Sequence, residues 1–199
     1  MIQFLQRATK PESRLRHCST VFLDRDGTIN VKASAGQYIT SPAQLSLIPG
    51  AAAAISRLNT ASMRVILVTN QRWLSCPGHK FSDYARVHAR LQELLAADGA
   101  RLDAAYYCPH AHGSCGCRKP SPGMLQRAAR EHGFTLDAAV MIGDTETDVA
   151  AGRAAGTATV FLRSGQQTVS HMADFVVDDL AEAVDLVLGD HVRKRSHGR

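Results

Sequence analysis

Short apolar runs alternate with helical patterns along most of this chain, and this alternation restricts the fold more than any other feature. Each run ends in a polar or glycine-rich turn and shows no polar alternation, which is typical of strands buried on both faces. The runs lie at 21–23, 65–68, 104–109, 138–144 and 157–163, with a weaker sixth at 174–179.

Helical segments fill the intervals between these runs. They are 51–59 after Pro49-Gly50, a helix from a Ser82 N-cap toward Leu95 with Gly99 as a stop, 123–131 after Ser121-Pro122 with an end near Gly133, 146–156, and 179–189. This alternation predicts a Rossmann-like three-layer α/β/α fold with a parallel sheet. Ligands of such sheets bind at the carboxyl ends of the strands, so the residues that follow each apolar run are the candidates for function.

The net charge of +5 is concentrated at the two ends of the chain. Residues 1–16 and residues 190–199 each carry a net charge of +3, which leaves −1 for residues 17–189. We therefore expect one folded domain over 17–189, between a basic N-terminal extension and a basic C-terminal tail. Because nucleic-acid binding normally needs a basic face on the fold itself, we expect no nucleic-acid partner.

The chain shows no sign of insertion into a membrane. Its longest uncharged run, 33–56, is interrupted by Pro42 and Pro49, and the N-terminus lacks an apolar segment followed by a cleavage site. We expect a cytoplasmic protein. The five cysteines agree, because their number is odd and three of them fall within ten residues among histidines, which favours metal binding over disulfides.

Two aspartates, Asp24 and Asp26, follow the first apolar run. A carboxylate at that point can ligate Mg²⁺ or attack phosphorus as a nucleophile. A second carboxylate two residues later can protonate a leaving group and then activate water. An Asp-x-Asp-Gly turn at the end of a strand explains the pair equally well when it is taken alone.

Polar residues also follow the second run and precede the helix at 123–131. Thr69, Asn70 and Gln71 can offer a hydroxyl, amides and backbone donors to a phosphate, and Lys119 can bring a positive charge to the same group. Taken singly, ordinary loop polarity and a surface lysine explain these residues as well.

A further carboxylate, Asp144, ends the fourth run. It can complete a Mg²⁺ site with Asp24, and Asp148 would lie one helical turn later as a supporting partner. A helix-capping role is the competing interpretation of Asp144.

Four strings that follow successive runs resemble, in order, the four motifs of the haloacid dehalogenase-like phosphatases: FLDRDGTIN, VTNQ, CRKPSPGM and MIGDTETD. The match is closer to the heptose bisphosphate phosphatases and histidinol-phosphate phosphatases within that family, and it spans roughly residues 21–162. The resemblance implies a haloacid dehalogenase-type fold. It implies Asp24 as nucleophile, Asp26 as general acid/base, Thr69, Asn70, Gln71 and Lys119 around the phosphoryl group, Arg118 at the substrate, and Mg²⁺ held by Asp24, the backbone carbonyl of Asp26, and Asp144.

The segment 108–117 presents the pattern C-x-H-x4-C-x-C. Three thiolates and one imidazole suit tetrahedral Zn²⁺, and a full protein shell makes such a site structural. The predicted ligands are Cys108, His110, Cys115 and Cys117, with His112 as a rival for the imidazole position. The resembling subfamily carries a similar zinc loop before its R-K-P string. Buried apolar cysteines are the competing explanation.

The resemblance weakens after the VTNQ string, where relatives usually carry a Ser-Gly-containing turn and this chain has Arg72-Trp73. That loop flanks the substrate, so the two residues affect either which substrate is accepted or only the anchoring of the loop. Tyr38 is a candidate substrate-side residue. The interval between Asp26 and Thr69 leaves no room for a large cap domain, which predicts an open pocket for a small phosphorylated metabolite.

The resemblance favours a Mg²⁺-dependent phosphatase that acts on a sugar phosphate, with D-glycero-D-manno-heptose 1,7-bisphosphate as the favoured substrate. Hydrolysis of histidinol phosphate is the alternative within enzymes. The alternative outside enzymes is a non-catalytic binding module that is stabilised by zinc. Following the relatives, we expect a monomer.

Overall fold

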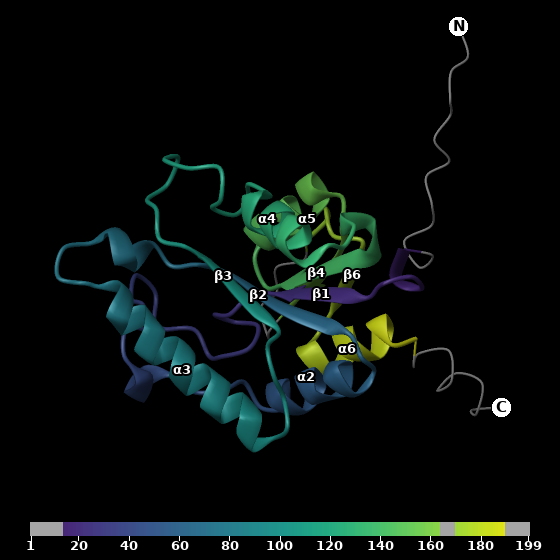
Figure 1. Ribbon diagram of the computed structural model, residues 1–199, viewed down its shortest axis with the longest axis horizontal. Helices are drawn as coiled ribbons and strands as arrows, with labels where there is room; N and C mark the ends of the chain where they lie inside the picture. Colours follow the sequence, from purple (N-terminus) through teal and green to yellow (C-terminus); the bar gives the residue numbers. More distant parts are fainter. Residues whose placement is uncertain (1–13, 164–169, 190–199) are drawn as a thin grey trace, which may run out of the picture.

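The computed structural model describes residues 14–163 and 170–189, which form one parallel sheet between two layers of helices (Figure 1). The six strands pair in the order β3-β2-β1-β4-β5-β6, and every pair is parallel. The strands are β1 (Thr20–Leu23), β2 (Arg64–Asn70), β3 (Ala104–Cys108), β4 (Ala139–Gly143), β5 (Ala158–Leu162) and β6 (Phe175–Val177). The predicted fold class is confirmed, and all six predicted runs, including the weak one at 174–179, are strands.

The helices cover both faces of the sheet. On one face lie α2 (Ala51–Thr60), α3 (Phe81–Ala97) and α6 (Leu180–Val187), and on the other lie α4 (Gly123–His132) and α5 (Glu146–Ala155) (Figure 1). Three short 3-10 helices, η1 (Pro42–Gln44), η2 (Arg72–Ser75) and η3 (Leu136–Ala138), connect these elements. Among the described residues no separate domain stands over the carboxyl edge of the sheet, as expected from the short interval before Thr69.

The two layers of the core are built from alternate residues of the strands. In β1, Val21 and Leu23 pack with α2, α3 and α6, whereas Phe22 packs with Met124 and Leu125 of α4. All three β1 residues are fully buried. Burial on both faces explains why the strands read as continuous apolar runs rather than as alternating patterns.

Two predicted helix starts are wrong. The N-cap of α3 is Lys80 rather than Ser82, because the Asp83 carboxylate reaches back and accepts a hydrogen bond from the Lys80 backbone N–H (2.8 Å). The N-cap of α4 is Pro122 rather than Ser121, so the helix starts at Gly123. At that position a Cβ would collide with the Gly116 carbonyl oxygen, so the helix can begin there only with glycine. The predicted end at Gly133 is confirmed, since Gly133 caps α4 with a φ of 66°.

At the amino-terminal side, Leu15 is buried in the core and the Arg14 guanidinium contacts the Asp174 carboxylate at 3.4 Å. The segments 1–13 and 190–199 lie outside the described residues, so the division into an extension, a domain and a tail remains a prediction. No helix within the described ranges has the length and apolar character needed to cross a membrane.

Candidate active site

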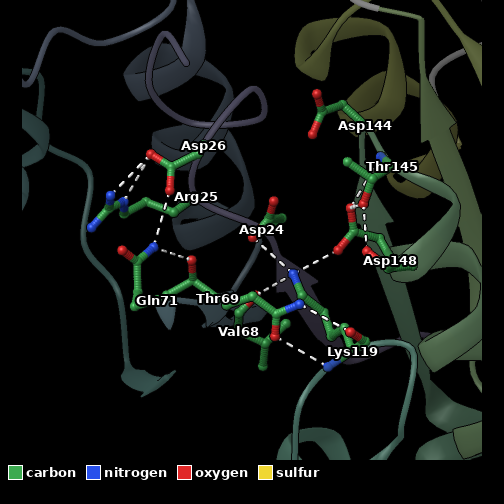
Figure 2. Close-up of polar contacts among 12 residues, drawn as sticks. Asp24, Arg25, Asp26, Val68, Thr69, Gln71, Lys119, Asp144, Thr145 and Asp148 are labelled. Carbon is green, nitrogen blue, oxygen red and sulfur yellow. Dashed lines mark hydrogen bonds and ion pairs between the residues drawn. The ribbon is translucent and has the colours of Figure 1, made fainter. Parts of the chain in front are cut away.

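The predicted site residues gather at the carboxyl edge of the sheet (Figure 2). Asp24 follows β1, Thr69 and Asn70 end β2, and Asp144 follows β4. Lys119 reaches the same place from the loop before α4, because its Nζ donates to the backbone oxygen of Val68 in β2 (2.7 Å).

Lys119 is the centre of a buried charge cluster. Its Nζ lies 2.8 Å from Asp24 Oδ1 and 2.5 Å from Asp148 Oδ1, and its side chain is only 2% exposed (Figure 2). Burial lowers the pKa of Lys119, but the attraction of Asp148 and Asp24 outweighs burial, so the pKa is raised. The lysine therefore stays charged and can neutralise a phosphoryl group at Asp24.

Asp24 itself is hard to ionise in the protein without a metal ion. Burial raises its pKa, the Lys119 charge lowers it, and the nearby carboxylates of Asp148 and Asp26 raise it, so that together they bring the pKa to about 7. Since a nucleophile must be ionised, a divalent cation beside Asp24 would favour the reactive form.

Three carboxylates, those of Asp24, Asp144 and Asp148, place oxygen atoms within 4.8 Å of one another. Asp144 Oδ1 is buried and has no hydrogen-bond partner among the described residues. Burial raises the pKa of Asp144, while its ion-pair partner Lys32 lowers it. Hard oxygen donors and an unsatisfied buried carboxylate oxygen fit Mg²⁺.

Glycines allow the backbone to approach these carboxylates. Gly27 has a φ of 92°, and a Cβ there would collide with the Asp144 carboxylate and with Lys32. A Cβ at Gly143 would collide with the side chain of Asp148. Both glycines lie next to the acids at the ends of the strands. Steric crowding therefore explains why the DRDG and IGD strings carry glycine at these positions.

Several hydrogen-bond donors hold the Asp26 carboxylate, which lies on the side of Asp24 away from Asp144 and Asp148 (Figure 2). Its Oδ1 accepts hydrogen bonds from Arg25 Nε (3.2 Å) and Nη2 (3.0 Å) and from Asn30 Nδ2 (3.0 Å). Its Oδ2 accepts one from Gln71 Nε2 (3.0 Å). The Asp26 side chain is 28% exposed, so this carboxyl group is accessible from solvent.

Thr69, Asn70 and Gln71, at the carboxyl end of β2, make different contacts. The Asn70 amide clamps the main chain of Lys119, donating to its carbonyl (3.0 Å) and accepting from its N–H (3.1 Å). The Gln71 amide donates to Asp26 and to Thr69 Oγ1 (2.7 Å). The structure therefore gives Asn70 and Gln71 supporting contacts around the site, while Thr69 lies within it.

Arg118 makes a different contact from the one that the resemblance implies. Its Nη1 approaches the backbone oxygen of His110 at 3.5 Å, and its buried Nε has no partner among the described residues. It lies next to the cysteine loop, and its predicted role at the substrate stays a prediction.

The cysteine loop brings four ligand atoms together at the end of β3. Cys117 Sγ lies 3.4 Å from Cys108 Sγ, 3.3 Å from Cys115 Sγ and 3.3 Å from His110 Nδ1. With zinc–sulfur bonds of about 2.3 Å, tetrahedral ligands lie about 3.8 Å apart, so the four atoms need only a small expansion to hold Zn²⁺. His110, not His112, belongs to this group.

The charge state of these thiols also fits a cation. Burial, and then the neighbouring sulfur atoms of Cys115 and Cys108, raise the pKa of Cys117 to about 12. Several thiolates crowded together repel one another unless a metal ion binds them.

Some contributions could not be predicted from the sequence. Asp148 contacts Lys119 directly and belongs to the carboxylate group, although the sequence indicates only a supporting partner. Arg25 is 1% exposed and binds Asp26, and Lys32 pairs with Asp144. Arg25 stands between the two predicted catalytic aspartates, which is a signal that could have been used, whereas nothing in the sequence marks Lys32.

Comparison with known proteins identifies similar chains. The sequence model of the HAD-hydrolase-like family matches residues 116–183. The D-glycero-D-manno-heptose-1,7-bisphosphate 7-phosphatase of Thermosynechococcus vestitus is 38% identical over 190 residues, covering 84% of this chain and 94% of that protein. The enzyme of the same name from Chlorobaculum tepidum is 37% identical, covering 85% of this chain and 94% of its own length.

A solved structure is similar as well. The crystal structure of D,D-heptose 1,7-bisphosphate phosphatase from B. bronchiseptica, complexed with magnesium and phosphate, superimposes with a TM-score of 0.78 at 30% identity. The alignment covers 86% of this chain and 99% of that one.

Proposed function

Since the chain belongs to the haloacid dehalogenase-like family of hydrolases, we propose that it is a Mg²⁺-dependent phosphatase of D-glycero-D-manno-heptose 1,7-bisphosphate that removes the 7-phosphate. We place the cleaved phosphate at position 7 because the similar enzymes are named 7-phosphatases. The observation that carries the proposal is the buried Asp24, held 2.8 Å from Lys119 and beside the carboxylates of Asp144 and Asp148.

The arrangement of the aspartates supports a two-step reaction. Asp24 attacks phosphorus, the bond between phosphorus and the sugar oxygen breaks, and Asp26 gives its proton to that oxygen. Water then attacks the aspartyl-phosphate and gives a proton to Asp26, which releases inorganic phosphate and restores Asp24. Lys119 and the Thr69 hydroxyl hold the phosphoryl oxygens during both steps.

The carboxylate group supports the metal requirement. Asp24, Asp144 and the backbone carbonyl of Asp26 would hold Mg²⁺, and Asp148 would hold Lys119 in place. When bound, Mg²⁺ neutralises charge on the phosphoryl group and keeps Asp24 ionised. The Cys108, His110, Cys115 and Cys117 group would hold a structural Zn²⁺.

The proposal also covers the substrate class, the compartment and the oligomeric state. A small phosphorylated metabolite in the cytoplasm is the expected substrate, and we expect a monomer without a nucleic-acid partner. The absence of a separate cap domain among the described elements is consistent with an open site for a small molecule.

The test is phosphate release from a panel that contains heptose 1,7-bisphosphate, other sugar phosphates and histidinol phosphate, with and without Mg²⁺. We expect the highest kcat/KM on heptose bisphosphate, and no turnover from Asp24→Asn, which keeps the shape and the hydrogen-bond acceptor for Lys119. A higher value on histidinol phosphate would replace the substrate. Absence of turnover on every compound with Mg²⁺ would favour the zinc-stapled binding module.

A further inference from the structure

We infer that Trp73 is a positioning residue for the reaction, because its indole N–H fixes the Gln71 amide that aims Asp26 at the leaving group. The inference rests on the proposed phosphatase function.

The indole decides which end of the Gln71 amide faces Asp26. Trp73 Nε1 donates to Gln71 Oε1 at 2.6 Å, and both residues are 1% exposed. An indole N–H can only donate, so the amide oxygen must face the tryptophan and the NH₂ group must face away from it. The two amide hydrogens then go to Asp26 Oδ2 (3.0 Å) and Thr69 Oγ1 (2.7 Å). The flipped amide would place its oxygen against the Asp26 carboxylate.

This contact orients the Asp26 oxygen that has the fewer hydrogen bonds from the protein. Oδ1 receives three hydrogen bonds, from Arg25 and Asn30, whereas Oδ2 receives the one from Gln71. The more crowded Oδ1 is the poorer proton carrier, so the acidic proton belongs on Oδ2. Gln71 is therefore the group that orients the proton-carrying oxygen.

The same amide connects the acid to the phosphate side of the site. Thr69 lies near the end of β2, and its hydroxyl shares the Gln71 NH₂ group with Asp26 (Figure 2). The distance between the acid and the phosphoryl-binding hydroxyl is thus set by one side chain. Proton transfer depends on such positioning, because a donor must lie within hydrogen-bond reach of the leaving oxygen.

Contacts within its own loop hold Trp73. The indole lies in η2, where the Leu74 N–H donates to the Gln71 carbonyl (3.1 Å). Its ring meets the His79 ring edge-on, with centroids 5.0 Å apart and an interplanar angle of 81°. These contacts hold the indole where it can donate to Gln71.

The experiment compares two leaving groups in the full-length, metal-loaded enzyme. A sugar alkoxide needs a proton from Asp26 to leave, whereas p-nitrophenolate is a stable anion and does not. Trp73→Phe keeps an aromatic ring and removes the donor. We expect its kcat/KM on heptose 1,7-bisphosphate to fall about tenfold, a part of what general acid catalysis supplies, and its kcat/KM on p-nitrophenyl phosphate to change less than about twofold.

Gln71→Met is the second variant. Its kcat/KM should fall further on heptose 1,7-bisphosphate than on p-nitrophenyl phosphate, with a smaller loss on both compounds because the same amide holds Thr69. Combining it with Trp73→Phe should add nothing, because both act through one amide. Tyr84→Phe is the matched control: it removes one polar group from a similarly buried aromatic whose hydroxyl has no hydrogen-bond partner among the described residues, and both rates should be unchanged.

An equal fall on both substrates would show that Trp73 only packs the loop, and unchanged rates would show that the amide needs no indole; either result overturns the inference. A wild-type enzyme that hydrolyses neither compound would instead overturn the proposed function, and the inference with it.

Discussion

Replacing Asp24 with asparagine should abolish turnover and, in Mg²⁺-free buffer, also change how the stability of the protein depends on pH. Burial raises the pKa of Asp24 from 3.8 to about 7, so the folded state holds a proton that the unfolded state releases. A group with a raised acid pKa costs stability as pH rises between those two values, and the cost is nearly complete above the higher one.

The size of the effect follows from the two pKa values. A rise in the pKa of Asp24 from 3.8 to about 7 corresponds to a cost of about 4 kcal/mol once this carboxyl is ionised in the fold. By linkage, less than half of this cost is present at pH 5, so roughly 2–3 kcal/mol of it develops between about pH 5 and about pH 8. The asparagine of the Asp24→Asn variant has no charge to bury and still offers an oxygen to Lys119.

The assay is urea unfolding of both proteins at about pH 5 and about pH 8 without added Mg²⁺. The difference in the free energy of unfolding between Asp24→Asn and the wild type should shift in favour of the variant by roughly 2–3 kcal/mol from the lower pH to the higher one. In a thermal scan this is a gain of about 5–10 °C for a chain of this size. Adding Mg²⁺ should reduce the gap at the higher pH, since the ion stabilises the ionised wild type. An equal gap at both pH values would refute the burial of an ionisable Asp24.

Two further predictions follow from the two metal sites. Lys32→Met should lower the Mg²⁺ concentration that half-saturates the protein in isothermal titration calorimetry, because Lys32 pairs with the Asp144 carboxylate and its positive charge opposes a cation bound there. An unchanged or weaker affinity would count against that competition. The purified protein should contain about one zinc per chain by elemental analysis, as a four-ligand site requires, and Cys115→Ser should lose the metal and lower Tm by several degrees, whereas the exposed Cys76→Ser, outside the cluster, should do neither.

The succession of strands and helices along the chain could be predicted because strands buried on both faces appear in the sequence as continuous apolar runs. The local start of α3 could not, since the choice between Ser82 and Lys80 depends on whether the Asp83 carboxylate folds back onto the chain. The same limit applies at the site. The topology of a parallel sheet brings Lys119 and Asp144 to its carboxyl edge, so their placement could be predicted. The pairing of Lys32 with Asp144 depends on the path of a loop and could not be predicted.

The cysteine loop and the proposed phosphate site are structurally connected. Cys117 lies two residues before Lys119, and the start of α4 at Gly123 packs directly on the backbone of Gly116. On the other side, the Asn70 amide clamps both main-chain groups of Lys119. The lysine main chain is thus fixed by β2 and by a loop too short to hold itself by apolar packing. The Lys119 ammonium group must be placed accurately to meet a phosphoryl group, so a structural Zn²⁺ in the cysteine loop would support the proposed phosphatase by holding this lysine in position.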